Sequence, residues 1–386
     1  MNINILTLLI TCLFLSLLMG ISYPLISEYI YAITNSSIFV GLIFSIKSIL
    51  GMLFVILGGF LADNIGRKKP IYIGTILMGF SFIIYAISNN ILEFIIASFF
   101  ESFSLFYFPA FNAMIMDSTE KDKLMKIFTI SLIFDHLPYS ITSILGGFIR
   151  DNYGILGLRI CFLISGIFII IIGIIRWKLL LETLIEIKKI NFKMIIKPYI
   201  EIFNDFKKLN PLIIRIIILR SFILLNAFSI FYSFSLIYAV RYAEILSFTE
   251  WGMILAISSF SYLIAIILVK ITKISYYPII IFFEAISILL FFIEEKISIL
   301  ISLILINILG ALTYAIERTI LAKTIEQQMR GRAETFMNLS FYIGSFIGSI
   351  LGGYFYTIYP PLILIIPFIM LILGSIIATI IFRKIQ

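Results

Sequence analysis

The chain has 386 residues, of which 61% are hydrophobic and only 13% are charged. Soluble globular proteins carry about 25% charged residues, so this composition excludes a water-soluble protein and indicates a polytopic membrane protein. The formal net charge of +8 does not indicate nucleic-acid binding, because the cations fall in loops between apolar spans. We therefore expect a lipid bilayer around the protein and no nucleic-acid partner.

Apolar stretches long enough to cross a hydrocarbon core recur along the chain. The first half contains six, at 5–31, 38–61, 71–88, 91–116, 127–149 and 156–177. The second half contains six more, at 212–240, 251–269, 276–293, 297–325, 334–356 and 362–382. The sequence therefore predicts an all-α membrane protein with twelve transmembrane helices in two pseudo-symmetric six-helix bundles.

The longest polar interval, residues 178–211, separates the two halves. Within it, Ile195, Tyr199 and Phe203 fall at helical spacing opposite a charged face, which is typical of a helix lying on a membrane surface. We expect an N-terminal bundle over 1–177, a cytoplasmic linker with this amphipathic helix over 178–211, and a C-terminal bundle over 212–386.

Lysine and arginine are concentrated in the loops on one side of the predicted bundles. These residues are Arg67, Lys68, Lys69, Lys121, Lys123, Lys126, Lys270, Lys273, Lys323, Arg330, Arg332, Arg383 and Lys384. Cytoplasmic loops carry an excess of such cations. The pattern predicts a multi-pass protein of the cytoplasmic (plasma) membrane with both termini in the cytoplasm.

The residue types that metal sites and enzymes need are scarce in this sequence. Cys12 and Cys161 lie inside apolar spans, and His136 is the only histidine. An intramembrane enzyme would need clustered metal-binding carboxylates or a Ser/His pair, and neither pattern is present. We expect buried thiols, no metal, no cofactor and no enzymatic activity.

A short polar island over residues 59–70 follows the second span, with the sequence G-F-L-A-D-N-I-G-R-K-K-P. It resembles the signature loop of the major facilitator superfamily, G-x-L-A-D-x-x-G-R-K-x, between that family's second and third helices. The defining positions are filled by Gly59, Leu61, Ala62, Asp63, Gly66, Arg67 and Lys68. The resemblance implies secondary active transport by alternating access, with two bundles rocking about a midplane site.

The resemblance also implies a cytoplasmic gate. In the family, the aspartate of the motif faces the start of the eleventh helix, expected here near Glu334. The arginine pairs with an acid that ends the fourth helix, a place that Asp117 occupies here. The gating residues implied are Gly59, Asp63, Gly66, Arg67, Lys68 and Asp117. The alternative is that these charges are solvated at the headgroup level and contribute little.

Several polar residues lie within the predicted spans, where a charge is costly and usually faces the protein interior or a watery cavity. In the family, helices 1, 4, 7 and 10 line the cavity, with 2, 5, 8 and 11 beside them. The candidates for substrate binding or proton coupling are Glu101, Lys47, Asp135, His136, Arg220, Asn226, Glu317 and Arg318.

Some of these residues have more than one interpretation. Lys47 lies at a depth similar to that of Glu101 and Asp135, so it can pair with either, and the pair can be structural or proton-coupled. Glu28 lies near a span end and is expected at the interface. Glu284, in the ninth span, is expected toward the periphery and has no assigned role.

Glycines recur every four residues in the eleventh span, at Gly344, Gly348 and Gly352. Small residues let membrane helices approach closely, so this strip predicts tight helix packing. Gly146 and Gly147 hold the same place in the fifth span as Gly352 and Gly353 in the eleventh, as a duplicated transporter would.

Taken together, these features predict a monomeric transporter for a small solute, with protons as the coupling ion. Scattered acids and many aromatic residues favour proton-coupled export of amphipathic or drug-like compounds. The runner-up is a proton-coupled uptake symporter for a sugar or another metabolite. Many proton-driven exporters of the family carry G-P-x-x-G-G in the fifth helix, whereas residues 142–147 here lack the Gly-Pro pair.

Overall fold

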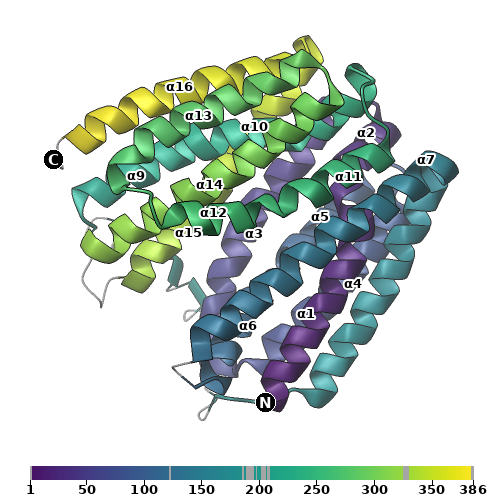
Figure 1. Ribbon diagram of the computed structural model, residues 1–386. Helices are drawn as coiled ribbons and strands as arrows, with labels where there is room; N and C mark the ends of the chain where they lie inside the picture. The colour runs from purple at the N-terminus through teal and green to yellow at the C-terminus, as the bar shows by residue number, and fades with distance from the viewer. Residues whose placement is uncertain are drawn as a thin grey trace. The chain divides into compact units, whose positions relative to one another are not determined.

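A computed structural model describes residues 2–120, 123–184, 187, 195–196, 198–200, 206, 209–324 and 330–383. The described residues form α-helices with short 3-10 and π-helical turns, and no strand occurs among them (Figure 1). The all-α class expected from the sequence is confirmed. The chain divides into two compact units: unit 1 is Met1–Thr34 with Ile46–Glu201, and unit 2 is Asn35–Ser45 with Ile202–Gln386.

The helices of the first half follow the predicted spans closely. They are α1 (Ile3–Ser22), η1 (Tyr23–Leu25), α2 (Ile26–Thr34), α3 (Ser37–Ile65), α4 (Lys68–Ile87), α5 (Ile91–Ser104), α6 (Tyr107–Ser118) and α7 (Leu124–Leu179). The first span consists of α1, η1 and α2, and Pro24 lies in the 3-10 turn between the two helices. The fourth span consists of α5 and α6.

The second half is built in the same way. Its elements are α9 (Pro211–Leu219), η3 (Arg220–Leu224), α10 (Leu225–Ile237), η4 (Tyr238–Tyr242), α11 (Phe248–Ser259), α12 (Ser261–Val269), η5 (Ile274–Tyr276), α13 (Tyr277–Leu289), η6 (Leu290–Ile293), α14 (Lys296–Thr324), α15 (Arg330–Ile358) and α16 (Leu362–Arg383). Two of the short elements, η3 and η4, are π-helical turns within the seventh span.

Eleven helical segments among the described residues are long and apolar enough to cross a membrane. One of them, within α7, is of double length, and the backbone at Gly154 breaks it with a φ of 63° and a ψ of −150°. A left-handed φ is open to glycine at no steric cost, so Gly154 is where the fifth span ends and the sixth begins. Each of the twelve predicted spans thus corresponds to a helical segment of the structure.

The predicted domain boundaries differ from the two units in detail. The division between Glu201 and Ile202 falls inside the interval 178–211 that we interpret as the linker. Much of the predicted amphipathic helix, including Phe203, lies outside the described residues. The first residues of α3 group with unit 2, because they pack on α15. The arrangement of bundle, linker and bundle therefore stays a prediction.

Unit 1 is held together by the packing of α1 and α4 on α7, which run side by side in Figure 1. Gly20 and Gly146 lie where α1 meets α7, and a Cβ on either would collide with backbone oxygen of the other helix. Ser16 accepts a hydrogen bond from the Tyr139 N–H (3.0 Å) and donates to the Asp135 carbonyl. It thereby satisfies backbone groups beside Pro138, which interrupts the α7 ladder.

In unit 2, α10 packs on α15 through the predicted glycine strip. A Cβ on Gly344 would lie 2.7 Å from Leu225 Cβ, and one on Gly352 would lie 2.8 Å from the Phe234 ring. One on Gly348 would collide with the Asn226 carbonyl oxygen. The tight packing expected from the glycine strip is confirmed.

Glu28, expected at the membrane interface near the end of the first span, is fully buried inside unit 1. The Arg150 guanidinium of α7 donates to both carboxylate oxygens, from Nε to Oε2 at 3.0 Å and from Nη2 to Oε1 at 2.7 Å. This bidentate geometry compensates the desolvation of both charges. The sequence alone did not show the pair, because Glu28 and Arg150 belong to separate spans and lie 122 positions apart.

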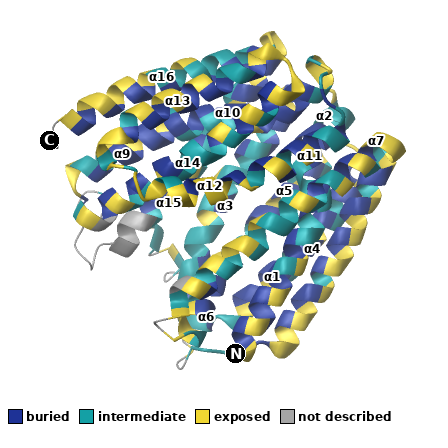
Figure 2. Ribbon diagram, in the orientation of Figure 1, coloured by how far each residue is buried: buried dark blue, intermediate teal, exposed yellow. Residues whose placement is uncertain are grey.

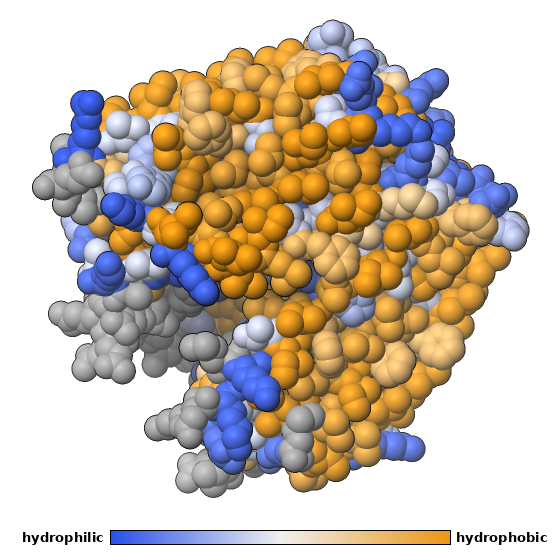
Figure 3. Space-filling view, viewed as in Figure 1, coloured by the Kyte–Doolittle hydropathy of each residue, from blue (hydrophilic) through white to orange (hydrophobic). Residues whose placement is uncertain are grey.

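Many large apolar side chains are exposed. Exposed residues recur along the helices in Figure 2, and hydrophobic residues cover much of the face seen in Figure 3. Examples are Phe14 on α1, Phe168 on α7, Ile266 on α12 and Ile376 on α16, each about half exposed or more. A soluble protein rarely exposes apolar patches of this extent. Such faces are suited to contact with lipid chains.

Gly348→Ala should destabilise the protein by about 1–3 kcal/mol, because the new Cβ forces α10 and α15 apart at the Asn226 carbonyl. Gly310→Ala is the matched control: no atom lies within 4 Å of its Cβ position. Alanine is preferred over glycine inside a helix, so this variant should be neutral or stabilised by about 0.5–1 kcal/mol. Thermal unfolding of the purified variants in detergent measures the difference; equal midpoints would contradict the packing.

Candidate functional site

The signature loop forms a tight turn between α3 and α4, and Gly66 makes the turn with a φ of 97°. Arg67 follows it and donates from Nη1 to Asp63 Oδ1 (3.1 Å) and from Nε to Asp117 Oδ2 (3.4 Å). The arginine side chain is 12% exposed, whereas that of Asp63 is 73% exposed. The structure thus brings Arg67 and Asp117 together, as the motif implies.

Glu182, just after α7, binds this loop and was missed by the sequence analysis. Its carboxylate accepts the backbone N–H groups of Arg67 (2.8 Å) and Lys68 (3.1 Å) at the first turn of α4. A carboxylate at a helix N-terminus satisfies orphan donors and interacts favourably with the helix dipole. A Cβ on Gly66 would collide with the Glu182 carboxylate, so the glycine serves both the turn and this contact.

Further hydrogen bonds join the chain after α7 to the helix ends near the signature loop. The Thr183 hydroxyl donates to Asp117 Oδ2 (2.8 Å). Asn4, at the start of α1, donates to the Leu181 carbonyl (3.1 Å) and accepts from the Leu181 N–H (2.8 Å). The only sequence signal for this region is an acid and a threonine at the start of a polar interval, too common a pattern to single out.

The other residues of the predicted gate have few described side-chain contacts. The Cβ position of Gly59 has no atom within 4 Å, so no described contact requires a glycine there. Its neighbour Gly58 is the residue that lets α3 approach Phe106 of the fourth span. Lys68 contributes its backbone N–H. The side chain of Glu334 lies outside the described residues, and α15 begins earlier, at Arg330.

A buried charge cluster centres on Glu101 in α5. Lys47 Nζ of α3 lies 2.8 Å from Oε1, and the Tyr23 hydroxyl of η1 donates to the same oxygen at 2.5 Å. The Tyr85 hydroxyl of α4 donates to Oε2 at 2.7 Å. Lys47 also donates to the Tyr23 oxygen at 2.5 Å and lies over the Tyr23 ring. Four transmembrane helices therefore meet at one carboxylate.

Asp135 and His136 are not part of the Glu101 cluster, so Lys47 pairs with Glu101 and not with Asp135. Both are in α7, with side chains 44% and 68% exposed, and His136 Nε2 lies 4.0 Å from Asp135 Oδ2. The Cys12 thiol of α1 lies 3.9 Å from Asp135 Oδ1. These two residues form a separate, more open polar patch of unit 1.

Unit 2 contains a second buried cluster, around Glu317 of α14. Arg220 forms an ion pair with it from η3, a π-helical turn of the kind that is frequent at functional sites. The Tyr277 hydroxyl donates to Glu317 Oε1 at 2.7 Å, and Arg220 Nε donates to the Ser340 hydroxyl at 3.1 Å. Two predicted candidates, Arg220 and Glu317, are thus brought together.

Arg318 and Asn226 lie in different surroundings within unit 2. Arg318 turns away from its buried neighbour Glu317: it donates to Asn338 Oδ1 (3.3 Å) and lies 4.6 Å from the centre of the Tyr314 ring. Asn226 is buried where α10 packs against Gly348 of α15, and its Oδ1 has no hydrogen-bond partner in the part of the chain that the structure describes. Asn226 thus lies at a close contact between these two helices.

Arg176 of α7 is a further buried polar residue that the sequence analysis did not list. It is 1% exposed and donates to the hydroxyls of Thr11 (3.0 Å) and Thr75 (2.7 Å). The rings of Tyr107 and Phe111 lie within 6 Å of its guanidinium. Arg176 lies near the end of a predicted span, and only the packing of four spans shows that it is enclosed.

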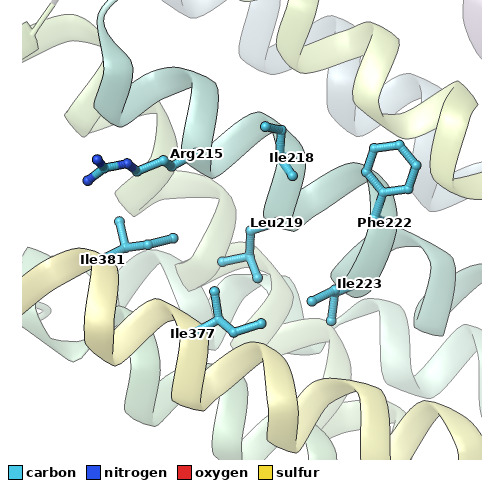
Figure 4. Close-up of a pocket in the computed structure, with 7 residues that line it drawn as sticks. All are labelled: Arg215, Ile218, Leu219, Phe222, Ile223, Ile377 and Ile381. Carbon is cyan, nitrogen blue, oxygen red and sulfur yellow. The ribbon is translucent and has the colours of Figure 1, made fainter.

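A shallow surface pocket of about 280 Å³ lies between the seventh span and α16 (Figure 4). Aliphatic side chains and Phe222 line it, and the Arg215 guanidinium points away from them. A pocket that recognises a polar solute needs several convergent polar groups, which this one lacks. Its apolar lining suits a lipid chain.

Residues 8–292 match the family model described as Major Facilitator Superfamily. Over 156 residues the chain is 29% identical to an uncharacterised MFS-type transporter of Methanocaldococcus jannaschii. That match covers 39% of this chain and 40% of the relative, so it spans less than half of either protein.

Several solved transporter structures share the fold. A variant of the nucleoside transporter NupG has a TM-score of 0.81 at 14% identity, covering 98% of this chain and 100% of its own. A POT family transporter in complex with 5-aminolevulinic acid has a TM-score of 0.79 at 12% identity, covering 100% and 97%. A peptide transporter POT has a TM-score of 0.75 at 14% identity, covering 99% and 95%.

At these identities the structural likeness shows the fold alone. The family model, however, covers well over half of the chain, and it includes the signature loop, the Glu101 cluster and part of the Glu317 cluster. The chain belongs to the major facilitator superfamily, as a multi-pass secondary transporter of small molecules and not an enzyme.

Proposed function

We propose that this transporter couples solute movement to protons and exports amphipathic or drug-like compounds from the cytoplasm. The observation that carries the coupling is the Glu101 cluster, in which one buried carboxylate takes donors from three other transmembrane helices. The cation distribution supports a location in the cytoplasmic membrane with both termini inside.

A change of protonation at Glu101 would change the ion pair and hydrogen bonds that join these helices. Ionised, the carboxylate pairs with Lys47 and accepts from Tyr23 and Tyr85. Protonated, it no longer balances the Lys47 charge, so Lys47 gains by reaching another acceptor or water. A proton can drive a conformational change only through such a difference in contacts between two states.

An uptake symporter is the second candidate. Its substrate class would resemble that of two solved transporters with the same fold, which are named for nucleosides and for peptides. Asp135 and His136 serve either direction equally, as exposed polar groups that a solute can contact. Arg220, Asn226, Glu317 and Arg318 are the corresponding candidates in unit 2.

We also propose that the signature loop is a latch at the cytoplasmic end of unit 1. Arg67 bridges Asp63 and Asp117, while Glu182 holds the first turn of α4. These contacts join the second, third, fourth and sixth spans, so the loop can move only with that end of the unit. Gly59, Gly66 and Lys68 complete the proposed gate.

Glu101→Gln should abolish solute accumulation driven by a pH gradient in proteoliposomes, because glutamine cannot bind or release the proton. The variant also leaves Lys47 buried without its carboxylate, which costs about 3–5 kcal/mol. The double variant Lys47→Gln/Glu101→Gln removes both charges and should recover most of that stability while transport stays uncoupled. Full pH-driven accumulation by either variant would refute the assignment of Glu101.

Direction is tested with purified protein in vesicles, using ethidium as a cationic amphipathic probe and labelled uridine as a metabolite probe. Export predicts that ethidium moves against its gradient as protons flow the opposite way. Uptake predicts that uridine enters together with protons. If the transport rate of either probe does not change with an imposed pH gradient, proton coupling is contradicted.

Asp117→Asn should slow transport several-fold with little change in stability, because the exposed ion pair with Arg67 contributes about 1 kcal/mol or less. Glu120→Gln is the matched control: a hydrogen bond from Lys123 lowers the pKa of Glu120, so this substitution also removes a full negative charge nearby. Transport rates in vesicles measure the effect. Equal rates for both variants would mean that Asp117 is an ordinary surface acid.

A further inference from the structure

Glu284 of α13 is a buried acid to which the proposed function gives no role. Its side chain is fully buried, and Oε1 accepts one hydrogen bond, from the Thr313 hydroxyl of α14 at 2.8 Å. Oε2 is buried and has no hydrogen-bond partner among the described residues. A carboxylate normally accepts several hydrogen bonds, so this environment is very poor for a negative charge.

The groups around Glu284 compensate its charge only in part. Arg220 of η3 acts on it electrostatically, but the ion pair of Arg220 goes to Glu317. Tyr232 of α10 and Tyr277 of its own helix also interact with it, and both are neutral hydroxyls. The neighbouring helix α16 carries a single ionisable residue, Arg383, at its last position.

Glu284 and Glu317 belong to one seam between α13 and α14. Tyr277 contacts Glu317 and Glu284 contacts Thr313, so the two hydrogen bonds join the same pair of antiparallel helices at successive levels. Thr313 and Glu317 are four residues apart, which places them on one face of α14. The seam therefore buries two carboxyl groups and one guanidinium.

We propose that Glu284 is a proton-binding site of unit 2. With both carboxyl groups ionised, the seam would carry a net charge of −1 away from water, which costs several kcal/mol. One bound proton brings the buried charge to zero. The ion pair with Arg220 keeps the charge on Glu317, so the proton resides on Glu284, whose Oε2 carries it and whose Oε1 accepts from Thr313.

Infrared spectroscopy of the protein in lipid at neutral pH tests this directly. The wild type should show the C=O band of a protonated carboxylic acid, and Glu284→Gln should lose that band. Glu250→Gln, which removes an exposed acid paired with Lys296, should keep it. An unchanged acid band in Glu284→Gln would overturn the proposal.

Two further variants keep the test valid if Glu284→Gln folds poorly. Thr313→Val removes the one hydrogen bond that the described residues make to the acid, so the band should shift to higher frequency; an unshifted band would contradict Glu284 as its source. Glu317→Gln leaves one carboxyl group for Arg220, so charge balance needs no proton and the band should disappear. Its persistence would overturn the charge-balance argument. No substrate is present, so these outcomes do not depend on the coupling proposed for Glu101.

Discussion

Burial of charge away from water is the constraint on which the rest of this structure depends. Within a bilayer, a charged side chain is costly unless it pairs inside the protein or faces a watery cavity. Glu28 pairs with Arg150, Lys47 with Glu101, and Arg220 with Glu317. Each pair joins different transmembrane spans, so it fixes how the helices of a unit meet.

Close helix approach makes these pairings possible. Gly20 and Gly146 bring the first and fifth spans together in unit 1, and Gly348 brings the seventh and eleventh together in unit 2. In lipid there is no hydrophobic drive between helices, so close packing and buried polar contacts must supply the cohesion. Each unit therefore combines close helix contacts at glycines with buried ion pairs between helices.

The two carboxylate clusters differ in chemistry although they share a plan. In unit 1, Glu101 takes Lys47 and two tyrosine hydroxyls, so its charge is well compensated. In unit 2, Glu317 takes Arg220 and Tyr277, but Glu284 adds a second carboxyl group with no cation of its own. Protonation of Glu101 would remove a charge that its neighbours compensate and would weaken its contacts. Protonation of Glu284 would remove a charge that its surroundings compensate poorly.

The sequence by itself determined the membrane class, the twelve spans, the signature loop and the glycine strip, because these depend on local composition and spacing. It also identified Glu101, Lys47, Arg220 and Glu317 as charged residues within predicted spans, where a charge is costly. Only the tertiary structure decided the partners: Lys47 with Glu101 instead of Asp135, Arg150 with a buried Glu28, and Glu182 on the signature loop. These contacts join residues as many as 122 positions apart, and spacing along one helix carries no information about which face of another helix it will meet.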